Sequence, residues 1–197
     1  SEWRDYKWDG VAKSNLISSM IDKKGNLFEN KKKFTLNAST KDLKKELQAQ
    51  IDLAKSIGIK PTHIDSHEGA LFFDQNIFKT YLEVGEENQL PVFVPSDVAV
   101  HFDKSFPKPE NVVIVENFHM ALPSLEFKDW NNYYINIIEN LKPGLSEIIV
   151  HLGYDDKEMQ QITVEHPNYG SKWRNLDMEV VSSENFKQAL KDNNIKL

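Results

Sequence analysis

Apolar residues recur at two different spacings along the chain, and the two spacings alternate. In residues 40–57, Leu43, Leu47 and Ile51 recur at the interval that places side chains on one face of a helix. Ser39 or Thr40 can cap this helix. The same reasoning predicts further helices over residues 75–88, 126–140, 171–181 and 183–193.

Short continuous apolar runs lie between the helices and are typical of strands that are covered on both faces. These runs are residues 91–95, 111–115 and 146–151, and another strand is expected to begin at residue 195. Residues 61–69, Pro-Thr-His-Ile-Asp-Ser-His-Glu-Gly, are expected to form a strand that runs out into a loop. Alternating strands and helices predict parallel strands joined by right-handed crossovers. The expected fold is therefore α/β, either an open sheet or a β/α barrel.

The N-terminal part shows no regular period. Residues 1–37 nevertheless carry five large aromatic side chains, which indicates an ordered excursion rather than a linker. A tight turn is expected at Gly25 and Asn26. The basic block Lys31-Lys32-Lys33 is expected to be a solvated turn.

Length and composition limit the classes of function. The 197 residues suit one α/β domain or a large part of a bigger one. A net charge of −6 argues against a general nucleic-acid-binding protein, because phosphate binding needs clustered Lys and Arg. No apolar run reaches a membrane-spanning length, and the absence of cysteine fits a cytoplasmic protein. A homo-oligomer is compatible with the sequence, and the oligomeric state stays open.

The candidate chemistry centres on His63, Asp65 and His67. A strand alternates its faces, so these three side chains would point the same way. Imidazole and carboxylate groups are the usual ligands of zinc and other divalent catalytic metals. The alternative is a polar strand end whose side chains bond to neighbouring loops. His151 follows a second expected strand, and functional groups collect at the carboxyl ends of parallel strands. Two independent strand ends with histidine favour a catalytic site at that face.

Three stretches of the sequence resemble one protein family. Residues 1–8 and 16–28 are similar to an aromatic segment and an "S-L-x-D-x-x-G-x-F" turn of the YdjC-like carbohydrate deacetylases, which include the chitooligosaccharide deacetylases. Residues 60–67, Lys-Pro-Thr-His-Ile-Asp-Ser-His, are similar to the family's most distinctive motif. Residues 143–155 are similar to its "P-G-x-x-E-x-x-x-H-P-x-Y" strand. The motifs occur in the family's order through nearly the whole chain.

The resemblance implies a β/α-barrel-like fold of the polysaccharide-deacetylase type and the removal of acetyl groups from N-acetylated sugars. It implies one divalent metal ion, Mg²⁺ or Zn²⁺, with His67 as a ligand. His151 would be the proton donor, and Asp65 would be a second catalytic residue in the same site as His67. Contacts to the N-acetylated oligosaccharide or small sugar would come from His63, Trp3 and Tyr154. An anchoring role for Trp3 is an open alternative.

The sequence also departs from the family pattern. The family places an Asp-Asp motif and a further metal-binding histidine upstream of the segment with which this sequence starts. Residues 1–197 are therefore expected to form a single domain, most of a YdjC-like barrel that lacks its N-terminal strands. Glu68 and Leu152 also replace residues that are common in the family.

Three functions remain open. The first is a metal-dependent carbohydrate N-deacetylase. The second is a carbohydrate-binding or regulatory protein that keeps the fold without catalysis. The third is another metal-dependent hydrolase, acting on a different amide or on a phosphate ester.

Overall fold

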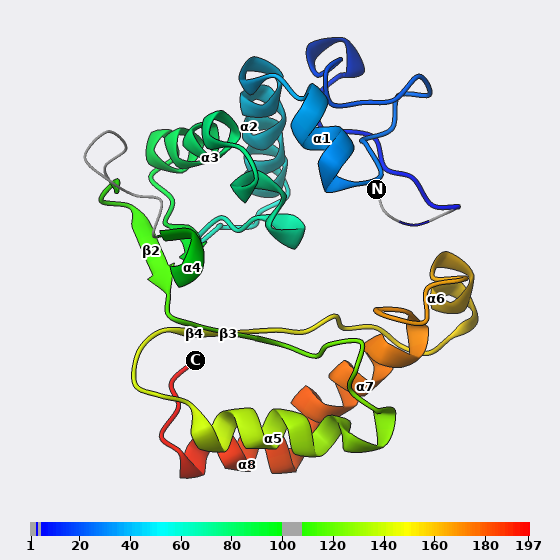
Figure 1. The fold of residues 1–197 in the computed structure, drawn as a ribbon, viewed down its shortest axis with the longest axis vertical. Coiled ribbons are helices and arrows are strands. Elements are labelled where there is room, and N and C mark those ends of the chain that lie inside the picture. Colours follow the sequence, from blue (N-terminus) through cyan, green and yellow to red (C-terminus); the bar gives the residue numbers. More distant parts are fainter. Residues whose placement is uncertain (1–2, 4, 100–107) are drawn as a thin grey trace. The chain divides into compact units, whose positions relative to one another are not determined.

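The computed structural model describes residues 3, 5–99 and 108–197, and it has a mixed α/β fold (Figure 1). The chain divides between Ile114 and Val115 into two compact units. Unit 1 is built from the described part of Tyr6–Ile114. Unit 2 contains Val115–Leu197 together with the segment of Trp3 and Asp5. The positions of the two units relative to one another are not determined.

Most of the regular secondary structure of unit 1 is helical. The helical segments are η1 (Ser14–Leu16), α1 (Lys31–Asn37), α2 (Thr40–Ser56), η2 (His67–Phe72), α3 (Gln75–Glu87) and α4 (Ser96–Ala99). Helices α2 and α3 pack side by side, and both agree with the helical spacing of the sequence (Figure 1). The core between them and the strands buries Leu43, Ile77, Tyr81 and Val92.

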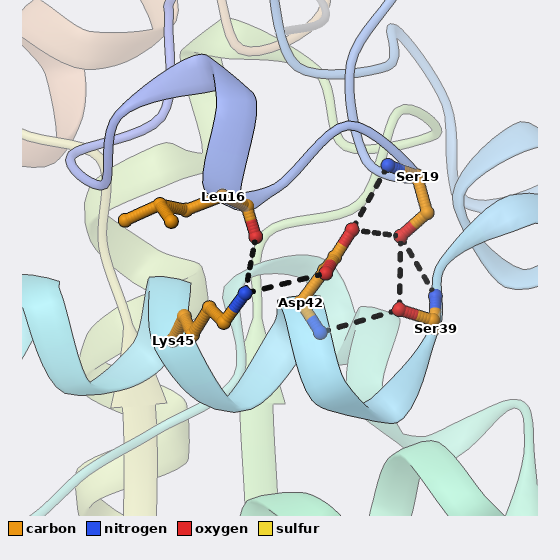
Figure 2. A network of polar contacts seen from close by, with 5 residues as sticks. All are labelled: Leu16, Ser19, Ser39, Asp42 and Lys45. Atoms are coloured by element: carbon orange, nitrogen blue, oxygen red, sulfur yellow. Dashed lines mark hydrogen bonds and ion pairs between the residues drawn. The ribbon is translucent and has the colours of Figure 1, made fainter.

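A polar network fixes the start of α2 (Figure 2). The Ser39 hydroxyl caps the helix by accepting from the Asp42 amide at 3.2 Å. Ser19 closes the network from a distant part of the chain, since its hydroxyl accepts from the Ser39 amide at 2.9 Å and donates to Asp42 Oδ2 at 2.8 Å. Lys45 bonds to the Leu16 carbonyl at 3.2 Å and lies 3.9 Å from Asp42 Oδ1. The irregular N-terminal region is thus tied to α2, as expected of an ordered excursion.

The strands of unit 1 are short. Strand β1 (Val92–Pro95) and strand β2 (Val112–Val115) pair in a two-stranded sheet. Helix α3 approaches β1 very closely at Gly85, where an added Cβ would lie 2.1 Å from Val92 Cγ2. Glycine at this position is therefore a packing requirement of the contact between the helix and the strand.

Unit 2 combines a parallel pair of strands with five helical segments. Strands β3 (Asn117–Met120) and β4 (Ser146–Ile149) pair in parallel, with Asn117 opposite Ser146 and Met120 opposite Ile149. The helical segments are η3 (Phe127–Asp129), α5 (Trp130–Asn140), α6 (Lys157–Ile162), α7 (Ser171–Ser182) and α8 (Glu184–Asp192). Helices α5, α7 and α8 pack against one another around buried Trp130, Trp173 and Val180. The parallel pairing of the strands before and after α5 confirms the expected parallel strands at this point.

Several expectations from the sequence are wrong in detail. Residues 61–69 form one isolated parallel bridge, Ile64 to Val92, and not a strand, and η2 begins at His67. The basic block at residues 31–33 opens α1, because Asn30 caps that helix by accepting from the Lys33 amide at 2.9 Å. Strand β3 and helices α1, α4 and α6 were not anticipated, and residues 195–197 form no strand.

The strands of the described residues pair as two separate two-stranded sheets, so the barrel stays a prediction. The single domain over residues 1–197 also stays a prediction. Within the described residues, no helix combines the length and the apolar content that crossing a lipid bilayer requires.

Candidate functional site

The segment that carries His63, Asp65 and His67 is held against β1 by its backbone. The Ile64 amide donates to the Pro91 carbonyl at 2.9 Å, and the Phe93 amide donates to the Ile64 carbonyl at 3.1 Å. The Tyr81 hydroxyl of α3 donates to the same Ile64 carbonyl at 2.9 Å. Three hydrogen bonds on one residue fix the middle of the segment, although it forms no regular strand.

The side chains of His63, Asp65 and His67 are exposed. The His63 ring stacks on Phe93, with centroids 4.2 Å apart and planes 9° apart, and its Nδ1 lies 2.9 Å from the Thr62 hydroxyl. Asp65 Oδ1 accepts from the Ser66 amide at 2.7 Å. These contacts hold His63 and leave the Asp65 carboxylate accessible to solvent.

A tight turn follows His67. Glu68 and Gly69 both have left-handed backbone conformations, with φ of 52° and 64°. The Gly69 amide donates to the Ser66 carbonyl at 2.8 Å, and the buried Ser66 hydroxyl accepts from the Leu71 amide at 3.0 Å. Lys31 reaches the turn from α1 and bonds to the Glu68 carbonyl at 3.2 Å. The turn determines how the chain leaves His67, because these two non-helical residues make a kink within η2.

A cavity of about 230 Å³ lies beside this turn within unit 1. Its polar lining includes Glu46, Gln50, Asp65, Ser66, His67 and Glu68. Glu46 is only 1% exposed, and its carboxylate accepts from the Val11 and Ala12 amides at 3.0 and 2.9 Å and from the Gln50 side chain at 2.7 Å. Three donors satisfy this buried carboxylate. Glu46 therefore fixes the loop at residues 11–12 to α2 and forms a rigid wall of the cavity.

The metal-site expectation can be compared with the side chains themselves. Within residues 3, 5–99 and 108–197, no three His, Asp or Glu side chains lie close enough together to hold one ion. A catalytic metal usually takes about three protein ligands. The described residues around His67 therefore do not complete such a set, and the divalent metal stays a prediction.

His151 belongs to unit 2, where it follows β4. Its side chain is 27% exposed, and its ring lies 5.1 Å from the Tyr169 ring. Asp177 of α7 contacts His151 twice. Oδ2 of Asp177 accepts from the His151 amide at 2.8 Å and lies 4.0 Å from Nδ1 of the imidazole. The structure thus pairs this histidine with a carboxylate that is 1% exposed.

The second oxygen of Asp177 is satisfied by α5. Its Oδ1 accepts from the Trp130 indole at 2.8 Å and from the Tyr134 hydroxyl at 2.7 Å. Burial, together with the hydrogen bond and the charge of Asp177, raises the pKa of Tyr134 well above its usual range. Tyr134 therefore stays a neutral donor. Asp177 joins α5, α7 and the end of β4 through three hydrogen bonds.

A second histidine of unit 2 lies on β3. His119 is opposite Ile148, and its Nε2 is buried without a hydrogen-bond partner within the described part of the chain. Because β3 and β4 are parallel, their carboxyl ends lie at the same edge of the sheet, where His151 follows β4. The structure gives no specific role to His119.

The two aromatic candidates for sugar binding differ in exposure. Trp3 is 5% exposed, and its ring lies edge-on to His166 at 4.9 Å and under the Arg174 guanidinium at 5.2 Å. These contacts support the anchoring role for Trp3. Tyr154 is 68% exposed, so its ring face is available for stacking on a sugar.

Sequence reasoning missed both buried carboxylates. Asp177 lies between Trp173 and Val180 at helical spacing, and Glu46 lies three residues after Leu43. An acidic residue at a position that the helical period assigns to the core was the available signal, because such a group must have buried partners.

The fold and these side chains can now be compared with known proteins. A solved structure from Enterococcus faecalis V583, described as a "putative cellobiose-phosphate cleavage protein", has a similar fold, with a TM-score of 0.72 and 17% identity over 96% of this chain and 70% of that one. A curated "Carbohydrate deacetylase" of Thermoanaerobacter pseudethanolicus is 24% identical over 181 residues, which is 92% of this chain and 68% of the relative. A second "Carbohydrate deacetylase", from Clostridium beijerinckii, is 24% identical over 190 residues, 95% of this chain and 71% of that one. The family model "YdjC-like protein" matches residues 3–192, and the chain belongs to this family.

Proposed function

We propose that this protein is a carbohydrate deacetylase that hydrolyses the acetamide of an N-acetylated sugar. The observation that carries the proposal is the match, over more than nine-tenths of the chain, to two proteins named carbohydrate deacetylase. Asp65 and His67, which line the cavity of unit 1, together with the exposed His63 and the half-buried His151, are chemical groups that suit this reaction. The finer expectation of a closed β/α barrel belongs to the same proposal.

The reaction needs two proton transfers. A water molecule attacks the carbonyl carbon of the acetamide, and a base takes its proton. When the bond between the carbonyl carbon and the nitrogen breaks, its electron pair stays on nitrogen, and an acid protonates that leaving amine. Asp65 is the proposed base because its carboxylate is exposed. The His151 imidazolium is the proposed acid.

The sugar contacts proposed from the sequence can be ranked by exposure. Tyr154 offers an exposed ring, and His63 offers an exposed imidazole that Phe93 holds in place. Trp3 offers little surface to a sugar because it is buried. The proposal therefore relies on Tyr154 and His63.

A divalent metal, Mg²⁺ or Zn²⁺, is proposed on the family resemblance, with His67 as one ligand. The test is metal content by elemental analysis of the natural full-length protein and of its His67→Ala variant. About one metal per chain in the wild type and much less in the variant is expected. Equal content in both would remove His67 from the metal site, and no metal in either would remove the metal from the proposal.

The experiment that tests the function measures acetate and primary amine together. The substrates are N-acetylglucosamine and its short oligosaccharides, supplied to the full-length protein with added Mg²⁺ or Zn²⁺. Equal amounts of the two products are expected, since N-deacetylation forms one amine per acetate. His151→Gln is expected to lower kcat by about 10²-fold, the usual loss when a general acid is removed. Neither acetate nor amine from any of these sugars would contradict the proposal.

A carbohydrate-binding protein without catalysis is the second candidate. It is favoured by the exposed ring of Tyr154, which could stack on a sugar whether or not a reaction follows. Sugar binding by calorimetry, with neither acetate nor amine formed, would establish this second function. Release of phosphate from sugar phosphates, or cleavage of other amides, would point to the third class considered from the sequence.

A further inference from the structure

The carboxylate of Asp177 does more than satisfy buried donors. The fold needs an acceptor there, because the Trp130 indole, the Tyr134 hydroxyl and the His151 amide all point at it. Oδ2, the oxygen that accepts from the His151 amide, also lies 4.0 Å from Nδ1 of the His151 ring. The enclosed negative charge therefore faces the imidazole at a distance where it favours the protonated form.

The orientation of the His151 ring determines which of its two nitrogens can take part in proton transfer. With Nδ1 turned toward Asp177, Nε2 is the nitrogen that does not face the carboxylate. The two ring nitrogens are distinct, and the partner of one determines the tautomer of the ring. The ring is 27% exposed, and Tyr169 contacts it at 5.1 Å, so the imidazole is held on one side and remains accessible.

We propose that Asp177 is a positioning residue for His151: it holds the imidazole with Nδ1 toward the protein and stabilises the protonated ring whose Nε2 serves the reaction. This inference rests on the proposed function in one respect, the identity of the proton acceptor. Nε2–H gives its proton to the nitrogen of the leaving amine as the amide bond breaks. The ring then becomes neutral and keeps its second proton on Nδ1, facing Asp177.

The Asp177→Asn variant removes the negative charge of the carboxylate and keeps a side chain of nearly the same shape. Tyr134→Phe is the matched control, since it removes one donor from the same carboxylate and leaves the charge in place. Neither variant replaces a group that touches the substrate. Both are expected to lose stability, so a purely structural role predicts the same behaviour for both.

Two measurements separate the roles. The first is nuclear magnetic resonance of ¹⁵N-labelled histidine, with the His151 signal assigned by its loss in His151→Gln. The neutral ring is expected to carry its proton on Nδ1 in the wild type and in Tyr134→Phe. In Asp177→Asn the proton is expected to move toward Nε2, and the titration midpoint of His151 is expected to fall. Unchanged spectra in Asp177→Asn would overturn the inference.

The second measurement is kinetic. Asp177→Asn is expected to lower kcat about tenfold or more with KM within about twofold, while Tyr134→Phe keeps kcat within about twofold. Equal losses of kcat in the two variants would show a structural role alone. Where Asp177→Asn does not fold, Asp177→Glu, which keeps the charge and displaces it, takes its place in both measurements.

The outcomes also separate this inference from the proposed function. A shifted His151 signal in a protein that releases no acetate would keep the pairing and reject the deacetylase. Acetate release with an unchanged His151 signal in Asp177→Asn would do the reverse.

Discussion

The amide and the hydroxyl of Ser19 both donate to the same oxygen of Asp42, at 3.1 and 2.8 Å, across 23 residues of sequence. Ser19→Ala removes the hydroxyl from this network and also removes the acceptor of the Ser39 amide. We expect the free energy of unfolding to fall by about 1–2 kcal/mol, measured by urea denaturation at pH 7. Ser56→Ala is the control, because the exposed Ser56 hydroxyl bonds to the nearby Leu53 carbonyl in the last turn of α2. Equal losses in the two variants would contradict the network.

The same carboxylate makes stability depend on pH. The Ser19 amide, followed by the Ser19 hydroxyl and Lys45, lowers the pKa of Asp42 below its ordinary value of 3.8, against the opposing effect of burial. A lowered pKa in the folded state stabilises the fold above pH 3.8, and this contribution is lost as the pH falls through the folded-state value. Asp42→Asn should therefore cost most at neutral pH and progressively less below about pH 4. Urea denaturation between pH 7 and pH 2.5 measures this, and an equal loss at every pH would contradict the prediction.

Gly85 and Val92 form a testable packing pair. In Gly85→Ala the new methyl group would meet Val92 Cγ2, and the Leu90 carbonyl at 3.2 Å limits any retreat. We expect a loss of about 1–3 kcal/mol in the free energy of unfolding, the usual cost of overpacking. Val92→Ala alone should also destabilise, by leaving a cavity. The double variant should lose less than the sum, because each change makes room for the other. Additive losses would show that the two residues do not compete for space.

The left-handed turn after His67 links backbone conformation to activity. Gly69→Ala places a side chain at a φ of 64° and within 3.2 Å of Phe72. We expect about 1 kcal/mol of destabilisation and a lower kcat in the acetate assay, because the direction of the chain at His67 changes. Gly69→Asn should be milder, since asparagine tolerates this conformation. Gly58→Ala is the matched control: its φ is 89°, nothing lies within 4 Å of the added Cβ, and Gly58 does not line the cavity. It should lose stability and keep kcat.

The sequence was informative where one regular period continues over several turns. The helices over residues 40–57, 75–88 and 183–193 appear within a residue of their expected ends, because an amphipathic face and a side-chain cap at the N-terminus determine each of them locally. The segment from His63 to His67 was overestimated as a strand. Its alternation of polar side chains reflects an extended backbone, but only Ile64 finds a partner in a neighbouring strand.

The residues of the candidate site were predictable from the sequence. The residues that hold them in place were not. His67 and His151 stand out in the sequence because strand ends carry functional groups. Their supports come from distant segments: Tyr81 holds Ile64, and Asp177 holds His151 across 26 residues. Hydrogen bonds of this range follow from tertiary packing, and no local pattern encodes them.

The three hydrogen-bond donors to Asp177 also constrain the order in which amino-acid substitutions can accumulate during evolution. Replacing Trp130 or Tyr134 with phenylalanine removes one donor to Asp177. The carboxylate then keeps its other hydrogen-bond partners. Replacing Asp177 first would leave three donors without their acceptor at once, and one of them, the His151 amide, belongs to the backbone and is kept in every substitution of His151 except proline. Trp130 or Tyr134 can therefore be substituted one at a time. Asp177 can be substituted only after the backbone that follows β4 has changed so that the His151 amide has another acceptor.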